Sequence, residues 1–447
     1  MDSLNRRSFL LALLASSMVA ACGTEPDGTV ATSPTSGDGT PPTTAGPDLD
    51  QVQPIAHSYE RIGPEAGVPT VPEVVTADRD LAAELFRLIS ESEPGNFLFS
   101  PYSIATAFSM TEGGAENETE QQMRSALGIA VPDPEWHSGR NALDVAIRTP
   151  SEVPDGTTPL ELQIANAQFG QAGFSFVDEF IRLLAEEYGA DLTTVDFVAD
   201  PEAARQLINA WVADQTGDRI TDLLPDGSIN SLVRFVLVNA VFFKAQWADE
   251  FDPAQTAPAP FTLLDGSEVE VEMMNGSSRT TYGQGNGWQS VRLRYWGGYS
   301  MTLILPAADR FDEVSDQVTT GLLDEISALQ SDHQVVLSIP KFNFETPVDL
   351  IPLFQALGMV DPFDPTMADF SGISTEAELY ISGSFHQATI EVDEFGTTAT
   401  AATAIIGGVT SMPEPAEFRA DRPFIFVIEH DATGEPLFMG RVLDPSA

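Results

Sequence analysis

The chain has 447 residues, of which 43% are hydrophobic, so it is long enough to bury a substantial core. Its 67 acidic residues against 21 basic ones give a formal net charge of −46, which argues against nucleic acid and anionic membrane surfaces as electrostatic partners. The single cysteine, Cys22, excludes an intrachain disulfide and thiol catalysis within the fold.

Residues 1–22 are predicted to be a lipoprotein signal peptide. The apolar run that ends at Ala21 is too short to span a membrane as a helix. Asn5–Leu10 (NRRSFL) resembles a twin-arginine export signal, and Val19–Cys22 (VAAC) resembles a bacterial lipobox, whose cysteine is lipidated. We therefore expect an exported cell-envelope lipoprotein, anchored through Cys22 and facing the extracellular or periplasmic side. The alternative is an ordinary signal peptide with an incidental cysteine.

Residues 23–70 are predicted to be a disordered tether. They are rich in Pro, Thr, Gly, Ser and Asp and show no hydrophobic periodicity. A flexible chain of this length has a root-mean-square span of roughly 40 Å, which would hold a folded domain clear of a membrane surface. No linker-like break follows, so residues 71–447 are predicted to form a single domain.

Hydrophobic periodicity predicts helices mainly in the first half of this domain and strands mainly in the second. The predicted helices are Asp78–Ser90, Ser100–Thr111, Glu118–Leu127, Phe176–Tyr188 and Glu202–Thr216. The predicted strands are Leu162–Phe169, Phe235–Phe243, Ser290–Leu293, Ser300–Leu305, Val335–Pro340, Ala388–Val392, Phe424–Glu429 and Leu437–Val442. Asp349–Leu357 should also be a helix, interrupted or kinked by Pro352. This mixture favours one large α+β domain with more than one sheet.

The segment Glu391–Ser411 (EVDEFGTTATAATAIIGGVTS) has an unusual composition. It begins as a strand and continues through eight small residues, Thr397–Ala404. Small side chains do not anchor a segment in a core, but Thr favours strands and small residues fit where backbones lie close. The run therefore suits an exposed loop in one state and a strand within a sheet in another. Composition alone favours the simpler interpretation, a flexible linker.

Sequence signatures of enzymes are missing. No HExxH motif occurs, and no histidine has a partner at metal-ligand spacing. No GxSxG motif occurs, so a hydrolase with a Ser-His-Asp set lacks a recognisable nucleophile. The GxGxG of Gly283–Gly287 does not open a predicted helix, and a turn is the better interpretation. We expect neither catalysis nor a metal or cofactor.

Several segments resemble the serpin family and follow the family's order. They are Asn96–Ile104 (NFLFSPYSI), Thr111–Thr119, Leu162–Phe169, Tyr188–Phe197, Ile208–Thr216, Leu237–Trp247, Ser338–Phe342, Ala368–Ser374, Phe418–Phe426 and Pro436–Val442. The resemblance covers roughly residues 75–445. It implies a fold of three β-sheets packed with eight or nine helices, and an exposed reactive-centre loop over 396–411.

The resemblance also assigns a hinge to the start of this loop. The hinge residues are Glu394, Gly396, Thr397, Thr398, Ala399, Thr400, Ala401, Ala402 and Thr403. A hinge that inserts as a strand points alternate side chains into the packed face, where an unpaired charge would cost several kcal/mol. Every residue of this hinge after Glu394 is uncharged and small. Phe395 and Thr398 depart from the residues frequent in inhibitory members, which leaves the speed of insertion open.

The family's spacing places the reactive bond between Thr410 and Ser411, with Ser411–Met412 as the alternative. Because Val409 and Thr410 are small and uncharged, they suit the shallow apolar pockets of elastase-like or subtilisin-like enzymes. The resemblance further assigns a shutter and a breach, where the central sheet parts. They comprise Ser100, Ser103, Asn239 and His386 in the shutter and Trp247 and Glu394 in the breach. Without the resemblance, a polar core cluster with no gating role is the simpler interpretation.

The resemblance implies a suicide-substrate inhibitor that is not an enzyme. The expected partner is a serine protease, with cysteine proteases as a second class, bound covalently 1:1 by a monomer. The expected mechanism is insertion of the cleaved loop into the central sheet. The alternative is a non-inhibitory serpin that acts as a binding or scaffold protein.

Overall fold

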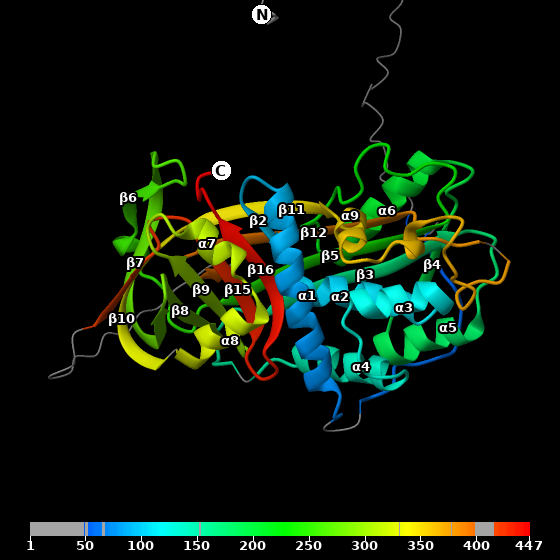
Figure 1. Ribbon diagram of the computed structural model, residues 1–447, viewed down its shortest axis with the longest axis horizontal. Helices are drawn as coiled ribbons and strands as arrows, with labels where there is room; N and C mark the ends of the chain where they lie inside the picture. Colours follow the sequence, from blue (N-terminus) through cyan, green and yellow to red (C-terminus); the bar gives the residue numbers. More distant parts are fainter. Residues whose placement is uncertain are drawn as a thin grey trace, which may run out of the picture. The chain divides into compact units, whose positions relative to one another are not determined.

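The structure is a computed structural model that describes residues 49, 52–64, 68–151, 153–329, 331–376, 378–397 and 415–447. These residues lie in one compact unit, Gly46–Ala447, and contain nine α-helices and two hydrogen-bonded β-sheets (Figure 1). None of the helices within these ranges is both long and apolar enough to cross a membrane. The helices are α1 (Val71–Ser92), α2 (Pro101–Glu112), α3 (Asn117–Ala126), α4 (Glu135–Ile147), α5 (Asp178–Leu183), α6 (Pro201–Gln215), α7 (Phe311–Asp316), α8 (Thr320–Leu329) and α9 (Leu350–Ala356).

The first sheet has seven strands in the order β1-β4-β3-β5-β13-β12-β11. They are β1 (Gln53–Pro54), β4 (Leu192–Val195), β3 (Glu161–Gln171), β5 (Phe235–Gln246), β13 (Gly396–Thr397), β12 (Gly383–Asp393) and β11 (Phe342–Asp349). Strand β5 is buried almost throughout, which explains its nearly continuous apolar sequence. It lies at the centre of the sheet, between β3 on one side and β12 and β13 on the other.

The second sheet has the order β14-β10-β7-β8-β9-β15-β16-β2, with β6 paired to β7. Its strands are β2 (Phe97–Phe99), β6 (Ala257–Thr262), β7 (Glu268–Gly285), β8 (Trp288–Tyr295), β9 (Tyr299–Pro306), β10 (Ser331–Pro340), β14 (Ala416–Arg419), β15 (Phe424–His430) and β16 (Glu435–Val442). Strand β7 runs for 18 residues and pairs with β6, β10 and β8. The resemblance implies three sheets, whereas the described residues form two hydrogen-bonded sheets. The continuous strand β7 accounts for the difference, because it links strands that would otherwise form separate sheets.

Two apolar clusters hold the layers together. The smaller one packs the outer face of β3 and β5 against α6, through Phe169, Val236 and Val238 of the sheet and Ile208 and Val212 of the helix. The larger one fills the space between the sheets and includes buried residues of α1 and α2. Since β5 contributes to both clusters, its alternate side chains serve the two faces in turn.

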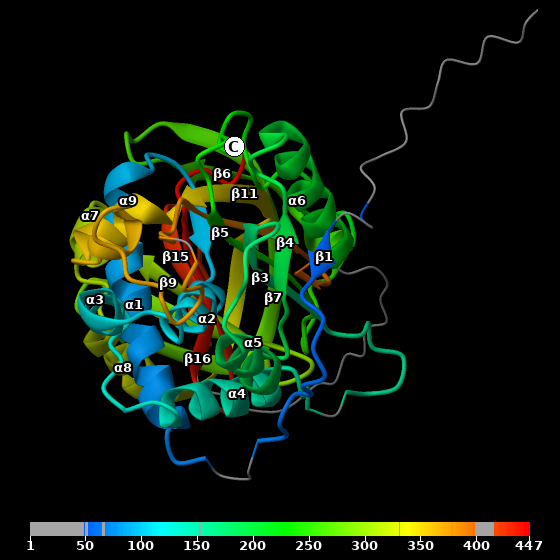
Figure 2. The same cartoon turned by 90° about the vertical axis from the view of Figure 1, so that its right-hand side faces the viewer.

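An N-terminal strap, residues 52–64, packs against this unit. Its strand β1 pairs with β4 at the edge of the first sheet (Figure 2). Further along, His57 bonds Asp191 at 2.7 Å, and Arg61 bonds Asp144 at 2.7 Å. The folded unit therefore begins before residue 71, within the segment whose composition predicts a tether. Isolated polar and aromatic residues without periodicity make these contacts, so the sequence pattern does not reveal them.

Local features follow known backbone preferences. Helix α9 contains Pro352 in its first turn, where no intrahelical N–H is lost, and the Asp349 side chain caps the helix by accepting from the Ile351 N–H. Pro352 therefore does not interrupt the helix. Gly287 adopts a positive φ of 86° in the turn between β7 and β8, which confirms the turn interpretation of the glycine motif.

Candidate functional site

The first sheet is closed along most of its centre and parts at one end. Strands β5 and β12 pair in parallel, from Val236 with Gly383 to Phe242 with Thr389. Beyond this point the two-residue strand β13 lies between them, antiparallel to both. Gly396 and Thr397 of the predicted hinge therefore already occupy the gap between the two central strands.

Gly396 and Thr397 fit this gap closely. A Cβ atom on residue 396 would lie 2.1 Å from the Ala245 carbonyl oxygen, so only glycine passes here without a shift of the backbone. The Thr397 side chain is 1% exposed, and its hydroxyl lies 2.7 Å from the hydroxyl of Tyr295 on β8. Thr397 thus points into the layer between the two sheets.

Trp247, one residue after β5, fixes the turn that precedes β13. Its indole Nε1–H donates to the Asp393 carbonyl at 3.0 Å, and its backbone N–H donates to the Phe395 carbonyl at 2.9 Å. Its ring stacks on Tyr295 with centroids 4.2 Å apart. The Asp393 carboxylate also accepts from the backbone N–H groups of Phe395 and Gly396, so the turn is held from both sides.

Glu394 anchors the same turn to neighbouring elements. Its carboxylate lies 2.9 Å from Lys341 Nζ and accepts from the Thr256 hydroxyl at 2.8 Å. Burial acts to raise the pKa of Glu394, but the Lys341 and Thr256 contacts outweigh it and hold the pKa below its usual value. The carboxylate therefore stays charged, and the ion pair fixes the turn beside one of the two lysines of the chain.

A polar cluster spans the centre of the closed sheet. It brings together Ser100, Ser103, Asn239 and His386, and it adds Asn166 of β3, which sequence reasoning missed. The Asn239 side-chain amide donates to Ser103 Oγ and to Asn166 Oδ1, both at 2.5 Å. Ser103 Oγ also donates to Asn166 Oδ1 at 2.9 Å. These five residues are named the shutter cluster below.

His386 closes the shutter cluster across the seam between β5 and β12. Its Nε2 accepts from the Ser100 backbone N–H at 3.1 Å, which assigns the proton to Nδ1, and Nδ1–H donates to the Asn239 side-chain oxygen. Burial lowers the pKa of His386 to about 3, so the imidazole is neutral at physiological pH. Any parting of β5 from β12 at this level must break the His386–Asn239 bond.

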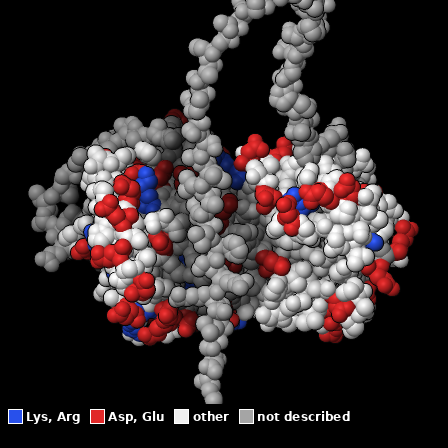
Figure 3. Space-filling model, turned by 90° about the horizontal axis from the view of Figure 1, so that it is seen from above, with Lys and Arg blue, Asp and Glu red and all other residues white. Residues whose placement is uncertain are grey.

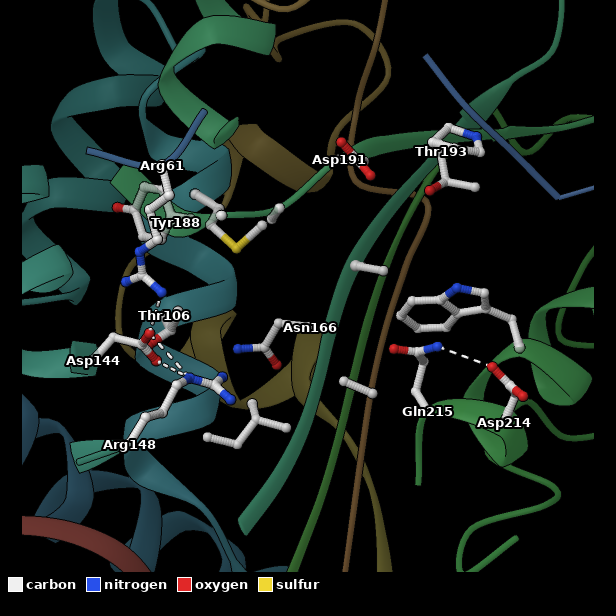
Figure 4. A pocket seen from close by; sticks show the side chains of 18 of the residues that line it. Arg61, Thr106, Asp144, Arg148, Asn166, Tyr188, Asp191, Thr193, Asp214 and Gln215 are labelled. Atoms are coloured by element: carbon white, nitrogen blue, oxygen red, sulfur yellow. Dashed lines mark hydrogen bonds and ion pairs between the residues drawn. The ribbon is translucent and has the colours of Figure 1, made fainter. Parts of the chain in front are cut away.

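A cavity of about 460 Å³ adjoins the shutter cluster (Figure 4). Asn166 lines it together with Thr106 of α2, Tyr188 and Arg61 of the strap. Figure 4 shows Arg61 and Arg148 converging on Asp144 at one wall. The void leaves the β3 side of the shutter cluster incompletely packed, so strands here can shift with less steric resistance.

Some predicted residues lie outside the described part of the chain. They are Cys22, Thr398–Thr403, Thr410 and Ser411. Asn166, Tyr295 and Lys341 are contact residues that sequence reasoning did not single out. Asn166 had a usable signal, since an asparagine within the apolar strand Leu162–Phe169 parallels Asn239 within β5. Tyr295 and Lys341 had none, because only the tertiary fold brings them to the turn.

Comparisons with known proteins agree with this geometry. Residues 76–445 match the model of the family described as "Serpin (serine protease inhibitor)". The leukocyte elastase inhibitor of Bos taurus is 35% identical over 387 residues, which cover 83% of this chain and 100% of that protein. An uncharacterized serpin-like protein of Methanosarcina acetivorans is 32% identical over 375 residues, covering 83% of this chain and 86% of that protein.

Two solved structures also resemble the structure of this chain. A tumour suppressing serpin superposes with a TM-score of 0.74 at 25% identity, covering 84% of this chain and 100% of that one. A thyroxine-binding globulin in complex with thyroxine gives a TM-score of 0.74 at 27% identity, covering 83% of this chain and 99% of that one. These matches confirm the expected fold. They include a thyroxine-binding protein, so the fold alone does not distinguish inhibition from ligand binding.

Proposed function

This chain belongs to the serpin family of serine protease inhibitors, and from that membership we propose that it inhibits serine proteases as a suicide substrate. The protease serine attacks the Thr410 carbonyl, the peptide bond breaks, and Ser411 leaves as a new N-terminus while Thr410 remains esterified to the enzyme. The freed arm from Gly396 onward then extends β13 between β5 and β12 and carries the protease with it. Distortion of the protease active site by about 1 Å is enough to slow hydrolysis of the ester roughly a hundredfold.

The position of β13 is the observation that supports this proposal most directly. Two hinge residues already pair with both β5 and β12, and the side chain of Thr397 already points inward. The sequence that follows remains small and uncharged through Ala404. About ten further inserted residues would form on the order of ten backbone hydrogen bonds, each contributing about 1 kcal/mol net.

The proposed targets are serine proteases with shallow apolar specificity pockets, and cysteine proteases form a second class. Val409 and Thr410 offer no positive charge to a trypsin-like pocket. The names of several relatives, which are elastase inhibitors, point to the same class of target. In this role the chain acts as a monomer, forms a covalent 1:1 complex and turns over no substrate of its own.

A denaturing gel tests the mechanism. Mixing the chain with elastase or subtilisin should give a covalent adduct, and mass spectrometry of the released C-terminal peptide should find Ser411 at its N-terminus. A cleaved loop beside fully active protease would support the alternative, a non-inhibitory serpin. Efficient inhibition of trypsin alone would overturn the proposed specificity.

A matched pair of hinge variants tests the insertion step. Thr397→Arg places a charge on the inward face, where burial costs several kcal/mol, so we expect the adduct to be replaced by cleaved inhibitor and free protease. Thr398→Arg places the same charge on the next residue, which a strand points to the opposite face, so more adduct should survive. Equal adduct formation by both variants would contradict insertion in this register.

We also propose that the chain is an exported lipoprotein held by Cys22. Detergent phase partitioning tests this: the full chain expressed in a bacterial host should enter the detergent phase and incorporate labelled fatty acid. Cys22→Ser should enter the aqueous phase without label. Incorporation of label by the Cys22→Ser variant would contradict the assignment of the anchor.

A further inference from the structure

Three side chains that sequence spacing did not connect meet where α2 ends and α4 begins. Glu112 is the last residue of α2, Asp133 lies just before α4, and His137 lies in its first turn. One ligand atom from each lies within 4.8 Å of the other two. His137 Nε2 is 3.7 Å from Glu112 Oε2 and 3.7 Å from Asp133 Oδ1. These three residues are named the α2–α4 cluster.

The α2–α4 cluster contains a buried acceptor without a hydrogen-bond donor, Glu112 Oε2. Glu112 is 1% exposed, and its Oε2 is buried without a hydrogen-bond partner. His137 is 2% exposed, and its Nδ1 bonds the Tyr188 hydroxyl at 2.6 Å. In the tautomer whose Nδ1–H donates to Tyr188, the Nε2 lone pair faces the two carboxylate oxygens. An unpaired buried acceptor such as Glu112 Oε2 is costly, and a cation beside it removes that cost.

The surroundings favour a divalent ion over a simple ion pair. Arg124 Nη1 binds the other Glu112 oxygen, Oε1, at 2.9 Å and Asp133 Oδ1 at 3.0 Å, so it holds both carboxylates from one side and leaves Oε2 free. Hydrogen bonds of this kind to ligating carboxylates, and from a ligating histidine, are typical of the outer shell of metal sites.

We propose that the α2–α4 cluster binds one divalent transition-metal ion of the zinc class. Zinc takes histidine nitrogen and carboxylate oxygen at about 2.0–2.2 Å, which places tetrahedral ligand atoms about 3.3–3.5 Å apart. The two separations of 3.7 Å from His137 Nε2 need to contract by only a few tenths of an ångström, and the two carboxylate oxygens lie within 4.8 Å of each other. Asp133, whose side chain is 39% exposed, provides the route from solvent, and water completes the coordination.

Gly113 lies against both Leu183 and the His137 ring. A Cβ atom on residue 113 would lie 2.2 Å from Leu183 Cδ2 and 3.2 Å from both Cε1 and Nε2 of His137. The bound ion would join the C-terminal end of α2, whose N-terminal end carries Ser100 and Ser103 of the shutter cluster, to α4. It is thus a structural site, separate from the hinge and from the reactive bond.

Zinc titration of the full chain, with Cys22→Ser in every sample to remove the only thiol, tests the proposal. We expect one zinc ion bound per chain, measured by competition with a chromophoric chelator, and a zinc-dependent rise in the thermal unfolding midpoint. Asp133→Asn and His137→Gln should each weaken binding at least tenfold and abolish most of that rise. The matched control is His57→Gln, which removes a histidine paired with one aspartate at 2.7 Å but with no second carboxylate.

Each outcome decides the question. Absence of saturable zinc uptake at micromolar concentrations would overturn the site, and so would zinc binding that survives Asp133→Asn and His137→Gln unchanged. If His137→Gln does not fold, Asp133→Asn decides alone, because Asp133 is partly exposed and its amide retains the shape of the carboxylate. Weakened binding in Asp133→Asn with an unchanged His57→Gln supports the assignment.

Discussion

Asn239 carries most of the polar connections between the central strands. Its side chain bonds Ser103, Asn166 and His386, and so links α2, β3 and β12 to β5. All of these groups except part of Asn166 are buried, so loss of one partner leaves the others without hydrogen bonds to water. A buried group left unsatisfied costs about 1–3 kcal/mol.

Asn239→Ala should therefore lower the free energy of unfolding by about 2–4 kcal/mol, because it leaves the buried His386 Nδ1–H without an acceptor and removes the hydrogen bonds to Ser103 and Asn166. Urea unfolding followed by circular dichroism measures the change. The control is Asn230→Ala, an exposed asparagine that accepts one loop N–H at 2.9 Å, for which we expect a change below about 1 kcal/mol. Equal effects of the two variants would show that the shutter cluster contributes no special stability.

The neutral state of His386 predicts how stability depends on pH. Burial lowers its pKa from 6.5 to about 3, so the unfolded chain takes up this proton at a higher pH than the folded one. Its contribution to stability is complete above pH 6.5 and is lost progressively as the pH falls toward 3. Glu112 acts in the opposite sense: its raised pKa of about 7 gives a contribution that is complete below 4.5 and is lost as the pH rises to about 7.

His386→Gln isolates the first effect. Between pH 4 and 6, the unmodified chain should bind about one more proton in the unfolded state than in the folded state because of His386. The slope of the unfolding free energy against pH should therefore be smaller in His386→Gln, by the amount that corresponds to about one proton. Urea midpoints measured at several pH values provide the slope. The exposed His333→Gln should leave it unchanged. An unaltered slope in His386→Gln would mean that this imidazole is already protonated in the folded state.

At the scale of elements, the N-terminal strap contacts both the edge of the first sheet and α4. Its first residues pair with β4 in the first sheet, and the Ile62 backbone bonds Glu186 and Asn141, which lie beyond the sheet edge. The strap lies outside the residues that match the family model, 76–445. It therefore couples the outer edge of the first sheet to α4, on the side away from the seam between β5 and β12.

Arg61→Met tests how firmly the strap is held. The Arg61 guanidinium bonds Asp144 at 2.7 Å and Asn141 at 3.0 Å in a partly buried position, so its loss should cost about 1–3 kcal/mol. Hydrogen exchange of the Ile55 amide, which donates to Leu192, should rise at the same time. Arg87→Met removes two exposed ion pairs on α1, with Glu84 and Glu91, and should cost no more than about 0.5 kcal/mol. Unchanged exchange at Ile55 would mean that Arg61 does not hold the strap.

Sequence patterns predict many of the helices and strands, but not the tertiary contacts between them. The five helices and eight strands predicted from periodicity are all present. Helix α4 and strand β7 were missed, since polar residues interrupt Glu135–Ile147 and alternate through Glu268–Gly285 without a strong apolar run. Other elements were not predicted either, namely α7, α8, β1, β2, β4, β6, β11 and β14. Partners such as Tyr295 and Arg61 depend on tertiary contacts, which no local pattern encodes, whereas Asn166 had a signal as an asparagine within an apolar strand.

At the scale of the whole molecule, the acidic side chains lie outside the segment 396–413, which contains no charged residue. Acidic side chains predominate on the face in Figure 3 and spread over it instead of gathering in one patch. By contrast, residues 396–413 contain no charged residue, although the chain carries a net charge of −46. A segment free of charge is compatible with burial in a sheet, and an acidic surface keeps the protein soluble before and after such a change.

The proposed insertion predicts that cutting the loop stabilises the molecule. In the intact chain the described part of β13 is Gly396–Thr397, and the unbroken chain tethers the arm that follows to β14. Cleavage between Thr410 and Ser411 removes this constraint and allows the arm to extend β13 between β5 and β12. On the order of ten new hydrogen bonds at about 1 kcal/mol each would then raise the thermal midpoint well above that of the intact chain, as calorimetry of both forms would show.

The Thr397→Arg variant, nicked in the same way, separates insertion from simple relief of strain at the loop. Its inward-facing charge blocks entry into the sheet, so nicking should leave its midpoint close to that of the uncut variant. Thr398→Arg should still gain most of the increase, since its charge faces the other side. If the nicked unmodified chain melts no higher than the intact one, the arm remains outside the sheet. The two paired hinge residues would then mark the end of β13 and not the start of a longer strand.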